Sequence, residues 1–358
     1  MRGKKILYVA SNMQHINNFH LDYIKALRDA GAAVVVMARG EGADIDIPFE
    51  KKLLSPKNRE ARRLIGQALS TGDYDAVILN TSLAAFHVRI AMRKKKRPRV
   101  LNIVHGYLFS KNVNPIKARL LLLAERVTRG KCDEIIVMNR EDLEIAGRYR
   151  LAGKVTLSRG MGASVREVIT PVDNIRREYF PEGSFVMCFV GELSPRKNQE
   201  FLLYALRRIK AEIPKAMLCL VGDGTERERL LQLAERLGVT ESVVLVGNRT
   251  DACDFMRASD LYVSASSIEG MPFNIIEALG ASRTVLASRI KGHEDIITVG
   301  VDGYLYEFGN IEDFVNKALH IYRNGALNPA ALAEKYAKYS KESVFPETLR
   351  LIEEFCKG

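Results

Sequence analysis

The sequence predicts an α/β protein with two successive domains, each a doubly wound parallel sheet covered by helices. Short runs rich in Val, Ile and Leu alternate with amphipathic stretches, which is the pattern of parallel strands that are buried on both faces. The alternation occurs twice, with a looser stretch over residues 165–183 between the two series. The length of 358 residues also exceeds the size at which a single hydrophobic core usually stops growing.

The first series opens with an apolar strand over residues 4–10, followed by an amphipathic helix over 17–31 that ends at Gly31. Further strands are expected over residues 32–38, 75–80, 99–104, 133–139 and 154–158. A helix over residues 83–96 separates two of these strands. We assign residues 1–170 to this first domain.

The second series opens with a strand over residues 184–191 and a helix over 198–214, which Pro214 ends. Further strands are expected over residues 217–222, 243–247, 261–266 and 284–288. Helices are expected over residues 226–239, 251–260 and 273–281. We assign residues 171–335 to this second domain. The segment 336–358 is helical, and its pattern alone leaves its packing partner open.

The composition is that of an ordinary soluble protein, with 47% hydrophobic and 27% charged residues. The five cysteines are odd in number, scattered and without a CxxC pair, which argues against a disulfide framework or a zinc site and favours a reducing cytosol. No signal peptide follows the apolar run at residues 6–10, and the run at 120–124 is too short to span a bilayer. We therefore expect a cytoplasmic protein.

The net charge of +11 lies entirely in the first half, because residues 1–170 carry +15 and residues 171–358 carry −4. A dense basic run extends from Arg93 to Arg99. Such asymmetry suggests an anionic partner for the first domain. Nucleic acid is disfavoured because no RNA- or DNA-binding motif accompanies the charge. An anionic membrane surface or a lipid-linked phosphate remains, and a solvated helix face is the alternative.

Ligands bind parallel α/β sheets at the carboxyl ends of the strands, so the loops there are the candidate binding segments. The loop over residues 10–17 has no glycine, which disfavours a nicotinamide-dependent dehydrogenase. The Gly222–Gly224 turn lets backbone approach a ligand, although a plain tight turn is the alternative. Arg196 and Lys197 stand at a helix entrance, where two cations suit a diphosphate. Solvated charges would have the same spacing.

The stretch EGMPFNIIEA places Glu269 in the loop after a strand and Glu277 inside the helix that follows. Pro272 suits the first helical position, and the N–H groups of Met271, Phe273 and Asn274 are expected to point toward a ligand. A sugar nucleotide has matching features: hydroxyls for the carboxylates and a diphosphate for the N–H groups. Acidic residues near a helix start are also common for dipole reasons alone.

Several motifs together resemble the family 4 retaining glycosyltransferases. They are FVGELSPRKNQEFLLYAL, VGDGTERERL, VGNRTD, ASDLYVSASSIEGMPFNIIEALG and IKGHEDIITVGVDGYL. The resemblance is continuous over roughly 184–305, and EGMPFNIIEA carries the family's E-x7-E motif. In the first domain ILYVASNMQHINNFHLDYIKAL, IVHGYLFSK and VMNREDLEIA resemble members that build capsular or exopolysaccharide repeat units. The resemblance implies the GT-B fold: two Rossmann-like domains facing a cleft, with the final helix crossing back to the first.

The resemblance assigns the donor to the second domain and the acceptor to the first. The residues that it places in the site are His105, Arg196, Lys197, Arg249, Glu269, Gly270, Met271, Pro272, Phe273, Asn274 and Glu277. Glu277 would bind the ribose hydroxyls, and Glu269 would hold the hydroxyls of the transferring sugar. Arg196 and Lys197 would neutralise the diphosphate without a metal.

The remaining implied roles concern the base and the first domain. Arg249 would lie beside the base through its backbone, and His105 would reach toward the donor sugar. Two departures from the family pattern stand out: Glu192 occupies a position where many members have Arg, and Pro272 removes one N–H donor. We interpret the second departure as a feature of the subfamily and not as a loss of function. His15, His20 and His87 are expected to be structural, and no cluster has metal-ligand spacing.

The implied function is a retaining, metal-independent transfer from a UDP-sugar to a polyprenyl-diphosphate-linked saccharide in bacterial surface polysaccharide synthesis. The family is thought to react on one face of the sugar, with the leaving phosphate oxygen deprotonating the acceptor. No cofactor is expected. One alternative is a nucleotide-sugar 2-epimerase of the same architecture. Another is a non-catalytic protein that binds sugar nucleotides.

Overall fold

The computed structural model describes residues 1–50, 55–93, 97–109 and 113–358. These residues divide into two compact units. The first unit combines Met1–Met161 with Glu342–Gly358, and the second unit is Gly162–Lys341. The chain therefore leaves the first unit after Met161 and returns to it after Lys341. The basic residues Lys94–Lys96, and Ser110 and Lys111 of IVHGYLFSK, lie outside the described residues.

The first unit is built on a seven-stranded sheet whose described strands all pair in parallel. Its strands are β1 (Lys5–Val9), β2 (Ala33–Ala38), β3 (Ile45–Asp46), β4 (Ala76–Leu79), β5 (Arg99–Val104), β6 (Glu134–Val137) and β7 (Lys154–Leu157). Its helices are α1 (Met13–Phe19), α2 (Leu21–Asp29), α3 (Pro56–Thr71), α4 (Ser82–Ala91), α5 (Pro115–Thr128), α6 (Arg140–Arg148) and α15 (Lys341–Lys357), with a 3-10 turn at Arg129–Lys131. The strand order is β3-β2-β1-β4-β5-β6-β7, so the order reverses between β1 and β4.

The second unit repeats this design with six parallel strands in the order β10-β9-β8-β11-β12-β13. The strands are β8 (Phe185–Val190), β9 (Ala216–Val221), β10 (Val243–Gly247), β11 (Leu261–Ser264), β12 (Val285–Ser288) and β13 (Gly303–Tyr306). The helices are α7 (Val172–Tyr179), α8 (Gln199–Glu212), α9 (Arg227–Leu237), α10 (Ala252–Arg257), α11 (Phe273–Gly280), α12 (His293–Ile296), α13 (Ile311–Asn324) and α14 (Pro329–Tyr339), with a 3-10 turn at Thr240–Ser242. The reversal here lies between β8 and β11.

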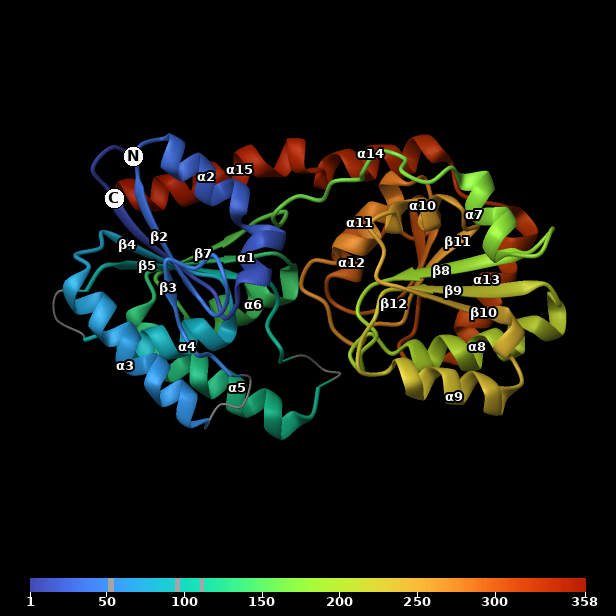
Figure 1. The fold of residues 1–358 in the computed structure, drawn as a ribbon, viewed down its shortest axis with the longest axis horizontal. Coiled ribbons are helices and arrows are strands. Elements are labelled where there is room, and N and C mark those ends of the chain that lie inside the picture. Colours follow the sequence, from blue (N-terminus) through green and yellow to red (C-terminus); the bar gives the residue numbers. More distant parts are fainter. Residues whose placement is uncertain (51–54, 94–96, 110–112) are drawn as a thin grey trace. The chain divides into compact units, whose positions relative to one another are not determined.

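Helices cover both faces of each sheet, as a doubly wound fold requires. In the first unit α3, α4 and α5 lie together on one side of the sheet, while α2 and α15 lie on the other (Figure 1). The apolar strands supply the cores: Leu7, Val77 and Ile135 belong to one buried cluster in the first unit. In the second unit Phe189 and Cys188, neighbours on β8, face separate clusters on the two sides of the sheet. The predicted fold class is confirmed.

The final helix α15 is held to the first unit by contacts with elements that are distant in the sequence. The Arg99 guanidinium donates to the carbonyl oxygen of Phe355 (2.6 Å) and stacks over the ring of the same residue. The hydroxyls of Ser158 and Thr348 are 2.9 Å apart. This settles the packing partner of the terminal segment, which its own pattern left open.

The segment before β2 differs from the expected single helix over 17–31. A first helix, α1, starts at Met13 because the Asn12 side chain accepts a hydrogen bond from the backbone N–H of His15 (2.8 Å) and so caps it. The chain then bends at His20 before α2 begins. All five cysteines are free, as their spacing predicted, and all five are also buried. Within the described part of the chain, no helix is long and apolar enough to cross a membrane.

We predict that the buried ion pair between Arg89 on α4 and Glu125 on α5 is required as a pair (Nη2 to Oε2, 2.8 Å). The Arg89→Met variant leaves the Glu125 carboxylate buried without its partner, so it should lower the free energy of unfolding by about 3–5 kcal/mol. The double variant Arg89→Met with Glu125→Met should recover most of this loss. Urea unfolding followed by circular dichroism measures both. A double variant no more stable than the single one would contradict the prediction.

Candidate functional site

The loops at the strand-order reversal of the second unit bring Glu269 together with Arg196 and Lys197. The Lys197 ammonium lies 2.6 Å from one carboxylate oxygen of Glu269, and the Arg196 guanidinium lies 3.0 Å from the other. Glu269 and Lys197 are buried, whereas 40% of the Arg196 side chain is exposed. The cluster carries one negative and two positive charges, so it holds one surplus positive charge.

Backbone contacts fix the loop after β8 against the loop after β11. Ser267 donates from its backbone N–H to the carbonyl oxygen of Arg196 (2.9 Å) and from its hydroxyl to the same oxygen (3.1 Å). Asn198, the N-cap residue of α8, adopts a left-handed backbone with φ of 56°, a conformation that asparagine tolerates better than most residues. The two cations therefore reach Glu269 from a loop held in place by hydrogen bonds.

Electrostatic matching keeps Glu269 ionised despite its burial. Burial alone would raise its pKa, but the charges of Lys197 and Arg196 and the hydrogen bond from Lys197 lower the pKa to about 2. His293 also lies close to this carboxylate. His293 itself is buried, its Nδ1–H donates to the carbonyl oxygen of Ser288 (2.8 Å), and its Nε2 has no hydrogen-bond partner among the described residues. Burial lowers the pKa of His293 to about 4, so it is neutral at pH 7.

The loop after β12 completes the surroundings of Glu269, and sequence reasoning missed its contribution. Gly292 has a φ of 81°, and a Cβ atom there would lie 2.9 Å from the carbonyl oxygen of Gly270 and 3.2 Å from the Cβ of Glu269. Only glycine fits this close approach. The neighbouring Lys291 is also buried. The signal in the sequence is the KGHED segment, which lies within one of the motifs that carry the family resemblance.

Glu277 lies in α11 and differs from Glu269 in its surroundings. It is half-buried, and no described side chain forms an ion pair or hydrogen bond with its carboxylate. Burial raises its pKa to about 7, an effect that the charge of Arg166 only partly offsets. An acceptor group without a protein partner can receive hydrogen bonds from ligand hydroxyls. Arg166, before α7, was not predicted.

The start of α11 corrects two details of the sequence prediction. Pro272 is the N-cap rather than the first helical residue. The N–H of Phe273 is not free, because it donates to the carbonyl oxygen of Met271 (3.1 Å). The Asn274 side chain donates to the carbonyl oxygen of Val190 (3.0 Å) and accepts from the N–H of Ile275 (3.0 Å). Asn274 thus ties α11 to the end of β8.

Arg249 and the Gly222–Gly224 turn lie toward the β10 edge of the same sheet. The Arg249 guanidinium forms two hydrogen bonds with the Asp251 carboxylate, both 2.8 Å, so its side chain is engaged within the protein. A Cβ at Gly222 would lie 2.0 Å from the carbonyl oxygen of Gly191. The turn therefore needs glycine so that the loops after β8 and β9 can pack together.

A second cluster forms in the first unit, also around a strand-order reversal. His105, at the end of β5, has its Nε2 2.9 Å from the Nε2 of His20, which lies 3.3 Å from the Nε2 of His15. The Tyr8 hydroxyl contacts the Nδ1 of His20 at 2.8 Å. Burial lowers the pKa of His105 and His20 well below the ordinary range and that of His15 to about 4, so the three rings are neutral.

This cluster was missed because it joins residues 85 positions apart, and His15 and His20 were expected to be structural. Among the described residues, these three histidines are the group whose possible metal-ligand atoms all lie within 4.8 Å of one another. Neutral imidazoles in this arrangement can share N–H···N hydrogen bonds or act as ligands of a transition metal.

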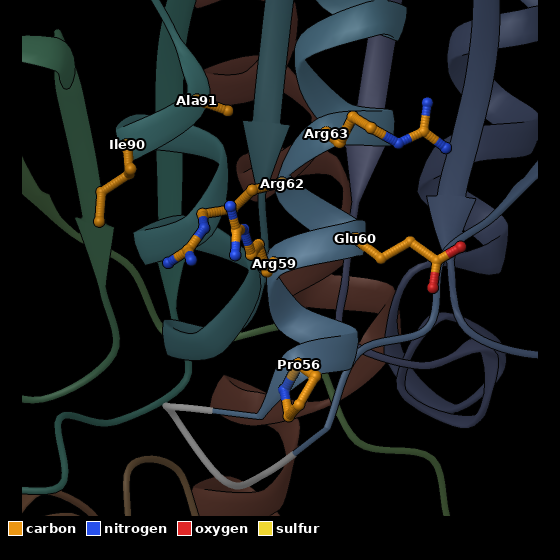
Figure 2. A pocket seen from close by; sticks show the side chains of 7 residues that line it. All are labelled: Pro56, Arg59, Glu60, Arg62, Arg63, Ile90 and Ala91. Atoms are coloured by element: carbon orange, nitrogen blue, oxygen red, sulfur yellow. The ribbon is translucent and has the colours of Figure 1, made fainter.

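A surface hollow of about 700 Å³ lies between α3 and α4, and none of the predicted site residues lines it. Figure 2 shows its lining, with Arg59 and Arg62 on the side of α3 that faces Ile90, and Glu60 and Arg63 on the other. It is open and strongly basic.

Comparisons with known proteins agree with this architecture. Residues 172–343 match the family model Glycosyl transferases group 1. The chain is 29% identical over 339 residues to the putative glycosyltransferase EpsD of Bacillus subtilis, covering 90% of this chain and 89% of that protein. It is 28% identical to the UDP-Gal:alpha-D-GlcNAc-diphosphoundecaprenol alpha-1,3-galactosyltransferase of Escherichia coli, covering 71% and 68%. The structure of sucrose-phosphate synthase from Thermosynechococcus elongatus superposes with a TM-score of 0.79 at 19% identity, covering 98% of each chain.

We predict that Glu277 makes the stability of the protein depend on pH near neutrality. Because the folded state raises its pKa from 4.5 to about 7, the folded protein keeps a proton that the unfolded chain releases. Stability should therefore fall as pH rises from 4.5 through 7, and Glu277→Gln should remove about 1–2 kcal/mol of this fall. Unfolding free energies of both proteins between pH 4.5 and 8 test this. The exposed Glu228→Gln is the control, and parallel curves for wild type and Glu277→Gln would refute the prediction.

Proposed function

We propose that the chain is a GT-B glycosyltransferase of the group 1 family, whose model residues 172–343 match, and that it transfers a sugar from a UDP-sugar to a lipid-linked saccharide with retention of anomeric configuration. The observation that carries the proposal is the pairing of an ionised Glu269 with Arg196 and Lys197, in the same unit as the carboxylate of Glu277, which has no ion-pair or hydrogen-bond partner among the described side chains. The family assignment favours transfer over epimerisation and over mere binding.

The second unit holds the donor in this proposal. Glu277 accepts hydrogen bonds from the ribose hydroxyls. Burial disfavours the charged form of this carboxyl group and so raises its pKa. Hydrogen bonds donated by the ribose stabilise the charged carboxylate and therefore oppose this effect. Lys197 stays with Glu269, because both are buried. Arg196 is the more exposed cation, so its guanidinium is the group able to turn toward the diphosphate. Gly270 and Met271 contribute backbone around the sugar, and Arg249 contributes backbone beside the base.

The transfer itself needs little covalent chemistry from the protein. The bond between the anomeric carbon and the phosphate oxygen breaks, and the acceptor oxygen bonds to the same face of that carbon. The acceptor hydroxyl proton passes to the leaving phosphate oxygen, so charge and atoms balance. The surplus positive charge of the Glu269 cluster stabilises the negative charge that develops on the diphosphate. Glu269 orients the sugar hydroxyls and Lys197, and no carboxylate acts as a nucleophile.

The nature of the acceptor is supported by two observations. The Escherichia coli relative is named for a diphosphoundecaprenol-linked acceptor and a UDP-Gal donor. The first 170 residues of this chain carry +15, which suits a lipid-linked diphosphate at an anionic membrane. We assign the acceptor to the first unit, with His105 as a site residue of that unit, and we propose that the reaction occurs at the cytoplasmic face of the membrane in surface polysaccharide synthesis.

We expect donor affinity to depend on Glu277 and Lys197. At pH 8 the Glu277→Gln variant loses the charged carboxylate that accepts hydrogen bonds from the ribose. It should therefore bind UDP-galactose roughly 10- to 100-fold more weakly. Lys197→Met should weaken binding further, because Glu269 is left buried without its closest cation. Titration calorimetry measures both, with Glu228→Gln as the control. Unchanged affinity in both variants would show that the donor site lies elsewhere.

We also expect transfer to proceed without a divalent metal, since Arg196 and Lys197 supply the positive charge that a metal ion would otherwise provide. Protein treated with EDTA and then freed of it should release UDP and form glycosylated product at the untreated rate. A loss of activity that Mg²⁺ or Mn²⁺ restores would contradict this. Restoration by Zn²⁺ that requires His15 and His20 would instead assign a metal to the histidine cluster.

A further inference from the structure

Helix α5 presents apolar side chains on two faces, and only one face has a partner within the described residues. On the inner face Ala118, Leu121 and Leu122 pack against the core of the first unit. On the same side, the Glu125 carboxylate is buried in its ion pair with Arg89. These contacts hold the helix on the unit, and the exposed apolar residues of the outer face take no part in them.

The outer face carries a line of exposed apolar residues, which we name the α5 stripe: Ile116, Leu120, Leu123 and Val127. Their exposed fractions are 69%, 62%, 51% and 69%. The steps of four, three and four residues place all of them along one side of the helix. Single exposed hydrophobic residues are ordinary, but a contiguous line of them marks an interaction surface.

The charges beside the α5 stripe all have one sign. Lys117, Arg119 and Arg126 are exposed on the same helix, and the helix's acidic residue, Glu125, is buried and neutralised by Arg89. An apolar line flanked by exposed cations is the pattern of a helix that lies in the interface of an anionic bilayer. A second copy of the chain is a poorer partner, because the same cations would face one another.

The dimensions agree with a helix that lies on a membrane. The 14 residues of α5 extend for about 21 Å, which is less than the hydrocarbon core that a spanning helix must cross. The inner face is also engaged with the core of the first unit. The helix can therefore bury its stripe among lipid head groups without leaving the protein.

We propose that α5 docks the protein onto an anionic lipid bilayer, with the α5 stripe inserted at the interface and Lys117, Arg119 and Arg126 on the lipid head groups. This inference deepens the proposed function, on which it rests for its biological purpose: a docked enzyme meets a lipid-linked acceptor at the surface where that acceptor resides. The docking itself is a property of the surface and can be measured without donor or acceptor.

The test is co-sedimentation of the full chain with phosphatidylcholine vesicles that contain or lack phosphatidylglycerol. We expect binding to the anionic vesicles, weaker binding to neutral ones and release by salt. Ile116→Ser with Leu120→Ser should weaken binding roughly tenfold or more, and Lys117→Glu with Arg126→Glu should weaken it at least as much. The matched control is Leu231→Ser with Arg236→Glu on the exposed face of α9, which should bind like wild type.

Each outcome bears on the proposal. Equal binding by wild type and both α5 variants, or no binding of wild type to anionic vesicles, would overturn it. So would sedimentation velocity that shows a wild-type dimer lost in the stripe variant. Because the substituted residues are exposed, the variants should keep their melting temperature and their affinity for UDP-galactose. Vesicle binding without any sugar transfer would leave the docking intact and sink the proposed function instead.

Discussion

The burial of the Glu269 carboxylate is the constraint on which the second unit's site depends. A charged group in a protein interior is tolerated only when it is matched by opposite charge and hydrogen bonds, and here Lys197 and Arg196 supply that match. Because these cations come from the loop after β8 and the carboxylate from the loop after β11, their pairing fixes the two loops that flank the strand-order reversal. The position of the candidate site and the local stability of the unit therefore have the same physical cause.

The first unit uses the same place in its sheet for different chemistry. Its reversal lies between β1 and β4, and the residues gathered near it are neutral imidazoles rather than paired charges. Asn12 caps α1 and so orients His15, while the bend at His20 turns that ring toward His105. The two units thus differ in the electrostatics of equivalent edges: one carries a surplus positive charge, and the other carries uncharged hydrogen-bonding groups.

The strands were predictable because each is a short apolar run between turn signals, and β1, β5, β8 and β10 were each placed to within one residue at either end. Helix α3 and strand β13 were not predicted. The sequence of α3 is mostly polar, as in a helix that faces solvent. Strand β13 is the short segment GYLY, which lacks the run of aliphatic residues that marks most of the other strands. Glu269 and Glu277 were found through the motif that contains them. The histidine cluster and the role of Gly292 could not be predicted from the sequence, because they depend on contacts between loops that only the tertiary fold brings together.

The way in which α15 completes the first unit has a consequence for synthesis. Its contacts with Arg99 and Ser158 join parts of the chain that are separated by the whole second unit. During translation the ribosome must therefore release the second unit before α15 can reach its docking surface. Until then the face of the first sheet that α15 covers stays open. The second unit, in contrast, is continuous in the sequence and can fold as soon as it emerges, so the order of folding need not follow the order of the chain.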